Sequence, residues 1–133
     1  MVIRLHGDMM GEHWFLGKRL FFYDGALKIP GIMAGPGISE GRIFKSLAES
    51  VDLMPTLLDL VAVPVPAEVQ GKSWYPVMRG DDTIIHDDVY TEIQHFRCPD
   101  PDHIWENEPK DEHIFSIFDG RYRIVYFIDR TYG

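Results

Sequence analysis

Cysteine is almost absent from this chain, since Cys98 is its only cysteine. One thiol cannot form an internal disulfide, whereas small secreted domains usually depend on several disulfides. The sequence therefore contains no disulfide framework that would indicate secretion. It leaves the cellular location open, and the lack of paired cysteines favours the cytoplasm.

Long hydrophobic runs and an excess of basic residues are also missing. No apolar run approaches the roughly 20 residues that a membrane-spanning helix needs, and the run from Met1 to Arg4 is too short for a signal peptide. Asp and Glu number 21 against 13 Lys and Arg, so the net charge is −8. A nucleic-acid partner would need a basic face. We therefore expect neither nucleic acid nor a membrane as a partner.

The composition that remains is that of an ordinary globular protein. The chain has 133 residues, of which 45% are hydrophobic and 26% are charged. Such a chain is long enough to form a domain with a hydrophobic core. Its function therefore has to be sought in particular motifs.

Chemically reactive side chains are concentrated in residues 6–18, HGDMMGEHWFLGK, shortly after the apolar pair Val2-Ile3. A strand that ends in a glycine-rich polar loop is a common place for a site in α/β proteins. His6 is a candidate metal ligand because neutral imidazole binds divalent cations. Lys18 is a candidate anion contact because its ammonium is a compact positive charge. The alternative is an ordinary surface loop, since this spacing matches no general metal-binding motif.

Several motifs, taken in order, resemble those of the sulfatase family. Within residues 6–18, the HG, GEH and GK elements match the family's Asp-His-Gly, Leu-Gly-Asp/Glu-His and Gly-Lys in order and spacing. VDLMPTLLDL at 51–60 and QGKS at 70–73 resemble the family's Val-Asp-Leu-x-Pro-Thr-Leu-Leu and Gln-Gly-Arg/Lys-Ser. The resemblance covers nearly the whole chain. It is closest to the arylsulfatase and phosphonate monoester hydrolase branch of the alkaline-phosphatase-like superfamily.

This resemblance implies a hydrolase whose substrate is a small-molecule sulfate ester, or a phosphate or phosphonate ester. In the family, a formylglycine made within Cys/Ser-x-Pro-x-Arg is the nucleophile, and a divalent cation (calcium, manganese or magnesium) activates it. His6 would then be a metal ligand. Lys18 would be the catalytic and substrate-binding residue that contacts the anionic oxygens. Such charges would stabilise an anionic transition state.

Two departures from the family pattern bear on activity. Leu5 stands where the family has a metal-binding aspartate, and leucine cannot bind a cation. The nucleophile motif is absent, because Cys98 is followed by PDPD and has neither the proline nor the arginine of the motif in place. The resemblance therefore implies a fragment, the C-terminal part of a sulfatase, with its formylglycine in an N-terminal half that this sequence lacks.

The implied fold class is α/β. Residues 1–85 would be the C-terminal part of an alkaline-phosphatase-like mixed-sheet sandwich, and residues 86–133 part of a small antiparallel sheet subdomain. Apolar residues at helical spacing predict a helix from Asp52, as its N-cap, to Ala62, and assign it to the core and not to a site. Strands are predicted at 2–5, 29–34, 42–47 and 89–93, and one helical turn near 9–12.

The C-terminal third has a different pattern. Asp119-Gly120 between two apolar runs predicts a two-residue hairpin turn joining residues 114–118 to 121–128. Residues 97–112 are rich in Pro, Asp and Glu and predict a long loop. A histidine metal cluster is an alternative site, although its spacing fits no closed zinc site; its members are His95, His103 and His113.

Three questions stay open at this point. Trp14, Phe15 and Leu16 are expected to be packing residues, with the wall of a substrate pocket as the alternative. The chain could be a non-catalytic truncated product or a module that docks onto a separate N-terminal half, for which exposed strand edges predict poor solubility or self-association. It could also be a metal-binding or partner-binding domain unrelated to ester hydrolysis.

Overall fold

A computed structural model of the chain describes residues 2–3, 6–17, 21–81, 84–95 and 112–128. The chain forms two compact units, Met1–Val89 and Tyr90–Gly133. The domain assignment from sequence had placed the boundary between residues 85 and 86, and it stays a prediction. None of the helices described is long and apolar enough to cross a membrane.

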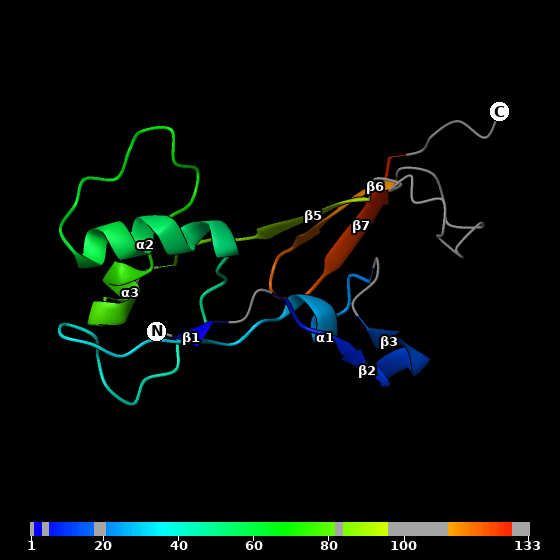
Figure 1. Ribbon diagram of the computed structural model, residues 1–133, viewed down its shortest axis with the longest axis horizontal. Coiled ribbons are helices and arrows are strands. Elements are labelled where there is room, and N and C mark those ends of the chain that lie inside the picture. The colour runs from blue at the N-terminus through cyan, green and yellow to red at the C-terminus, as the bar shows by residue number, and fades with distance from the viewer. Residues whose placement is uncertain (1, 4–5, 18–20, 82–83, 96–111, 129–133) are drawn as a thin grey trace, which may run out of the picture. The chain divides into compact units, whose positions relative to one another are not determined.

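The first unit begins with two short antiparallel strand pairs (Figure 1). Strand β1 (Val2–Ile3) pairs with β4 (Gly31–Ile32), and β2 (Met9–Met10) pairs with β3 (Leu16–Gly17). The 3₁₀ turn η1 (Glu12–Trp14) joins β2 to β3. The helical turn predicted near residues 9–12 is therefore wrong in its position. Met9 and Met10 form strand β2, and the helical turn begins only at Glu12.

Helix α2 (Leu53–Leu60) follows directly on the 3₁₀ turn η2 (Ser50–Asp52). The predicted helix is confirmed, and its C-terminal end differs from the prediction by two residues. Pro55 lies in the first turn, where a backbone N–H has no acceptor within the helix, so proline costs no helical hydrogen bond. Asp52 makes no side-chain cap on α2. It belongs instead to the preceding turn, where Glu49 and Asp52 form a reciprocal capping box.

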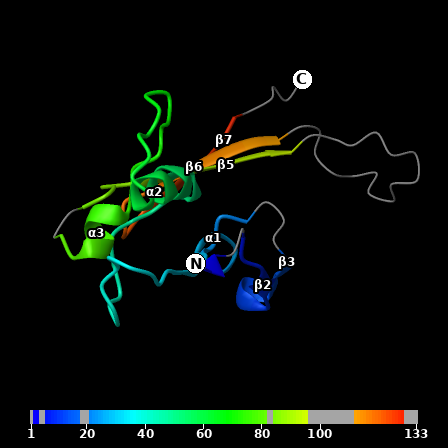
Figure 2. The same cartoon turned by 60° about the vertical axis from the view of Figure 1, so that its left-hand side comes forward.

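Helix α3 (Tyr75–Arg79) lies beside α2 in both views of the molecule (Figures 1 and 2). It ends at Gly80, whose φ of 105° is the left-handed conformation that glycine adopts readily. Val77 and Met78 on α3 and Ile85 after it are buried. The core of the first unit therefore includes this short helix and the segment that follows it.

The strand predicted at 42–47 does not form, which corrects the sequence reading. Among the described residues of this segment only Leu47 makes a β-bridge, an isolated antiparallel one with His86. Ile43 is 89% exposed, so its apolar side chain has no core to define a strand face. A short apolar run at this place is therefore not sufficient for a strand.

The second unit is a three-stranded sheet in the order β5 (Val89–His95), β6 (Glu112–Phe118) and β7 (Arg123–Phe127). The predicted strand at 89–93 is confirmed. The hairpin is confirmed as well, with β6 and β7 antiparallel from Ile114↔Phe127 to Phe118↔Arg123. The predicted long loop at 97–112 lies almost entirely outside the described residues.

The hairpin turn is longer than the two residues predicted. Residues 119–122 connect the strands, and Oδ1 of Asp119 accepts hydrogen bonds from the backbone N–H of Arg121 at 2.8 Å and of Tyr122 at 2.6 Å. Gly120 has a φ of 91°, as the turn requires. Because the aspartate side chain satisfies two backbone donors, the chain closes through a wider loop than the Asp-Gly pair alone suggested.

Candidate functional site

His6 lies after β1 with its side chain exposed. The glycine that follows it determines its place, because Gly7 donates a backbone hydrogen bond of 2.9 Å to Ala26 in α1 (Asp24–Leu27). A Cβ at Gly7 would lie 2.0 Å from the carbonyl oxygen of Gly25, so only glycine fits this approach. His6 Nδ1 lies 3.0 Å from the Gly7 carbonyl oxygen, which a protonated Nδ1 would hydrogen-bond.

Lys18 and Leu5 lie outside the described residues, so the geometry joining them to His6 is not defined. Their roles stay predictions. Among the described residues, the one group of three metal-ligating side chains with close ligand atoms is Glu49, Asp52 and His86, and it does not include His6. The described surroundings of His6 therefore do not amount to a cation site, and a metal bound there would need ligands from elsewhere.

The turn between β2 and β3 is strained. His13 has a φ of 53° and Trp14 a φ of 66°, and these are two of the three non-glycine residues with positive φ in the described part of the chain. Side chains with a Cβ rarely adopt this conformation, which costs roughly 1–2 kcal/mol for each residue. Two such residues in succession mean that the surrounding contacts hold the turn in place.

Those contacts come from the backbone and from stacked rings. The backbone N–H of Gly11 donates a 3.0 Å hydrogen bond to the carbonyl oxygen of Phe15, which closes the turn. Oε2 of Glu12 accepts a hydrogen bond of 2.8 Å from the backbone N–H of Met10. This hydrogen bond, together with a lesser one from the N–H of Glu12 itself, holds the pKa of the Glu12 carboxyl below its usual value. The His13 ring stacks on Tyr23 with centroids 4.2 Å apart and planes 19° from parallel.

Trp14 sits at the tip of this ordered turn and is 98% exposed. The packing role predicted for Trp14 is therefore wrong, as it is for Leu16, which is 73% exposed. Phe15 does pack, against Phe21 at 4.1 Å between centroids. The sequence does not reveal which of these three side chains packs and which is exposed. Their directions depend on the positive φ angles of His13 and Trp14 in the turn.

A second constellation is centred on Asp52, whose side chain is completely buried. Its carboxylate accepts hydrogen bonds from the backbone N–H groups of Glu49 and Lys72, both at 2.8 Å, and from the Trp74 indole N–H at 3.0 Å. His86 Nε2 lies 3.0 Å from one carboxylate oxygen and 2.9 Å from the other. One carboxylate thus ties together three segments of the first unit, namely the turn at residues 49–52, residues 72–74 and His86.

Thr56 extends this network along α2. Its hydroxyl donates to the Asp52 carbonyl oxygen at 2.6 Å and accepts from the Trp74 backbone N–H at 2.8 Å. No buried side-chain nitrogen or oxygen in the described part of the chain lacks a hydrogen-bond partner. The network is therefore complete in itself, as buried polar groups generally are.

The charge of Asp52 is stabilised in spite of its burial. Burial by itself favours the neutral acid and raises the pKa. The hydrogen bonds from Glu49, Lys72, Trp74 and His86 act in the opposite direction and prevail, so the pKa of Asp52 is lower than its ordinary value of 3.8. Asp52 is therefore a carboxylate at neutral pH.

The Glu49, Asp52 and His86 ligand atoms lie within 4.8 Å of one another, a spacing that a cation could bridge. Both Asp52 oxygens, however, already accept hydrogen bonds, and the His86 nitrogen that faces them is part of this set. We interpret the constellation as a structural tie. The helical spacing after Asp52 predicts only a core role for this segment, and the network is not visible in the sequence because nothing local connects Asp52 with His86.

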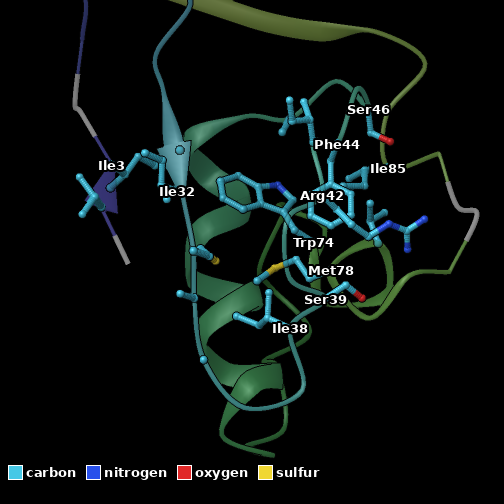
Figure 3. A pocket seen from close by; sticks show the side chains of 18 of the residues that line it. Ile3, Ile32, Ile38, Ser39, Arg42, Phe44, Ser46, Trp74, Met78 and Ile85 are labelled. Atoms are coloured by element: carbon cyan, nitrogen blue, oxygen red, sulfur yellow. The ribbon is translucent and has the colours of Figure 1, made fainter.

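A cavity of about 770 Å³ lies within the first unit. Figure 3 shows Ile3 and Ile32 of the β1–β4 pair on one side of it, with Phe44, Trp74 and Met78 nearby. Among the described residues that line it, His6 is not included. Ile32 and Ile43 line it while being 64% and 89% exposed. The cavity is therefore an open, mostly apolar surface, and His6 does not form part of it.

The alternative histidine cluster finds little support in the described residues. The side chains of His95 and His103 lie outside them. His113 Nε2 and Glu92 Oε1 form a hydrogen bond across the second unit's sheet. That pairing accounts for His113 without a metal.

Comparison with known proteins connects both units to one family. Residues 11–132 match the family model described as N-sulphoglucosamine sulphohydrolase, C-terminal. The chain is 42% identical over 79 residues to a Delta 4,5-hexuronate-2-O-sulfatase of Bacteroides thetaiotaomicron, a match covering 57% of the chain and 16% of that relative. It is 38% identical over 73 residues to an arylsulfatase of Clostridium perfringens, and this match covers 51% of the chain and 15% of that relative.

Solved structures agree with these matches. A phosphonate monoester hydrolase of Silicibacter pomeroyi superposes with a TM-score of 0.79 at 31% identity, covering 95% of this chain and 26% of its own. A 2-O GAG sulfatase gives a TM-score of 0.76 at 30% identity, with the same coverage. The predicted fold class, part of an alkaline-phosphatase-like α/β fold, is confirmed. The chain spans about a quarter of these structures and less of the curated relatives.

Proposed function

Because the chain belongs to the sulfatase family described by the C-terminal region of N-sulphoglucosamine sulphohydrolase, we propose that it forms one side of an ester-hydrolysing site. Its substrate would be a small-molecule sulfate ester, or a phosphate or phosphonate ester. The observation that supports this most directly is the position of His6, held after β1 by the Gly7 contact with α1. In this proposal Lys18 binds the anionic oxygens of the ester.

A divalent cation and a formylglycine belong to the same proposal. Calcium, manganese and magnesium are the candidates, since a hard cation supplies charge that stabilises an anionic transition state. His6 would be one ligand, with the remaining ligands from outside the described residues. The sequence contains no Cys/Ser-x-Pro-x-Arg motif, so we expect no ester hydrolysis by this chain alone.

Anion binding tests the proposal directly. Inorganic sulfate is titrated into the chain with and without Mn²⁺, and the Lys18→Ala variant is compared with Lys28→Ala, which removes an exposed lysine elsewhere in the first unit. We expect Lys18→Ala to weaken sulfate binding and His6→Ala to abolish any enhancement by Mn²⁺. His113→Gln serves as the histidine control. Unchanged sulfate affinity in Lys18→Ala would contradict the proposal.

A second function, docking, is favoured by the apolar cavity. The matched structures are about four times longer than the region they share with this chain. We propose that the cavity side chains, including Val2, Ile32 and Ile43, pack against a nucleophile-bearing region of the sulfatase type. Without that region the same surface would promote self-association. Ile43→Glu should then lower the sedimentation coefficient of the isolated chain, while Ile124→Glu on β7 serves as the control.

A further inference from the structure

We propose that Asp52 acts as an acid-sensitive clasp on residues 84–86. As a carboxylate it holds this segment to the rest of the first unit, and protonation of Asp52 releases the segment. Residues 84–86 precede β5, which begins at Val89, so the clasp fixes the path of the chain shortly before that strand. This device is independent of the proposed function, because every contact that forms it lies within the first unit.

Ile85 and His86 attach this segment to the first unit at two adjacent points. Ile85 is buried, and its carbonyl oxygen accepts a 3.2 Å hydrogen bond from Nζ of Lys72. His86 forms the β-bridge with Leu47 and bonds to the Asp52 carboxylate at 2.9 Å. The residues on either side of this pair, at positions 84 and 87, are exposed. A segment that is held at two adjacent residues can open locally while the rest of the unit stays folded.

The described groups that bond to the Asp52 carboxylate are all hydrogen-bond donors. Three of them are N–H groups, from the backbones of Glu49 and Lys72 and from the indole of Trp74. The fourth is His86, which must carry a proton on Nε2 because a carboxylate can only accept. A proton added to Asp52 would point at one of these donors and displace it, at a side chain that is completely buried. Protonation therefore breaks a bond of the network.

Titratable groups from the surrounding elements determine the pH at which this happens. Glu49 on η2 has a carboxylate oxygen within 4.8 Å of the Asp52 and His86 ligand atoms. The ammonium of Lys72 bonds to the backbone of the segment, and the group from α2 is the uncharged Thr56 hydroxyl. Burial raises the pKa of Asp52, but the hydrogen bonds from its neighbours outweigh burial and keep the pKa below 3.8. The clasp is therefore closed above pH 3.8 and opens as pH falls through the folded pKa.

The clasp also forms part of the wall of the cavity in the first unit. Trp74 and Ile85 line this cavity, and both are labelled among its lining side chains in Figure 3. The hydrogen bond from the Trp74 indole to Asp52 fixes the direction of that ring, and the bond from His86 holds the neighbouring Ile85 in place. Opening of the clasp therefore alters the same surface that we propose for docking.

Hydrogen exchange on the full chain measures this opening, with EDTA present to remove metal ions. Two N–H groups report the clasp because Asp52 is their acceptor: the Lys72 amide and the Trp74 indole, which Trp74→Phe identifies. The Gly7 amide, which bonds to Ala26, reports the rest of the first unit. We expect the protection factors of the two reporters to fall by up to about tenfold for each pH unit below 3.8. Dilute urea should change their exchange little and that of Gly7 strongly, because a local opening exposes little surface.

Four variants identify the group that titrates. Asp52→Asn imitates the protonated acid, because it keeps the shape of the side chain without its charge, and both reporters should have low protection already at pH 7. His86→Ala releases the segment from the other side and should also lower their protection at pH 7, so the test does not depend on the folding of Asp52→Asn. Asp59→Asn on α2 is the control, and Glu49→Gln removes the other nearby carboxylate. Both should keep the acid transition of the wild type.

Four results would overturn the clasp. Protection of the two reporters could be the same at pH 7 and pH 3, or it could fall in acid with the same urea dependence as Gly7, which would indicate global unfolding. Full protection at pH 7 in both Asp52→Asn and His86→Ala would show that neither side chain holds the segment. Loss of the acid transition in Glu49→Gln would identify Glu49 as the titrating group in place of Asp52.

Discussion

The turn at residues 11–15 and the Asp52 network use their side chains in opposite ways. The turn holds strained backbone and leaves Trp14 in solvent. The network buries a charge completely and satisfies every hydrogen bond that it needs. A network whose groups are all hydrogen-bonded stabilises the fold, whereas a strained turn that leaves a large side chain exposed costs stability. Substitutions in the Asp52 network should therefore lower the stability of the fold, whereas a substitution that relieves the strain at Trp14 should raise it.

The largest effect is expected from Asp52→Ala. This change leaves the Trp74 indole N–H, His86 and two backbone donors buried without their acceptor. Removing one partner of a buried pair costs about 3–5 kcal/mol, and the free energy of unfolding measured by urea denaturation should fall by that amount. Asp59→Ala on the adjoining helix α2 is the control. A loss no greater than that of the control would mean that Asp52 is not a structural tie.

Gly7→Ala should have the next largest effect. The added Cβ would stand 2.0 Å from a backbone oxygen, so β1 and α1 would have to move apart. We expect a loss of about 1–3 kcal/mol in the free energy of unfolding, as for other overpacked sites. Gly31→Ala is a matched control, because a Cβ there would meet no atom within 4 Å. Equal stability of the two variants would show that the Gly7 contact is not required.

The pH dependence of stability should distinguish Asp52 from exposed acids. Its pKa in the folded protein is lower than the unfolded value of 3.8, so its contribution is complete well above pH 3.8 and is lost as pH falls through the folded pKa. Wild type should therefore lose stability below pH 3.8 more steeply than Asp52→Asn, by at most about 1.4 kcal/mol per pH unit. Parallel unfolding curves from pH 2 to 7, measured by circular dichroism, would contradict this.

The smallest change concerns Trp14→Gly. Glycine adopts a φ of 66° without a Cβ penalty, so the variant should gain about 1 kcal/mol in the free energy of unfolding. Ala62→Gly relieves a similar φ of 55° at the end of α2 and should stabilise the fold as well. If Trp14→Gly were destabilising in thermal melts, the indole would be a packing residue after all.

Local sequence signals account for much of the fold. The helical spacing of residues 53–60 and the alternation in β5 were sufficient to predict both elements. The hairpin was predicted from Asp119-Gly120, but its length depended on a side chain that bonds two backbone donors. The strand predicted at 42–47 failed because β structure needs a partner and a buried face, and neither is visible in a short run of residues.

The candidate site was only partly predictable. The order of motifs in residues 6–18, 51–60 and 70–73 was enough to identify the family, and the first of these segments was enough to select His6. Nothing in that order indicates that Trp14 is exposed, since this follows from two positive φ angles held by contacts with residues such as Tyr23. The partnership of Asp52 and His86 spans 34 residues and required the folded chain.

By itself, the sequence of this protein determined its family and the residue types in its motifs. It also determined most helices and strands, because capping, periodicity and turn chemistry act over a few neighbouring residues. Tertiary structure alone decided which side chains became buried acceptors and which became exposed surfaces. The physical reason is that burial and hydrogen-bond satisfaction depend on segments that are distant along the chain. Asp52 became a structural tie, and Trp14 a free aromatic face, only once those segments met.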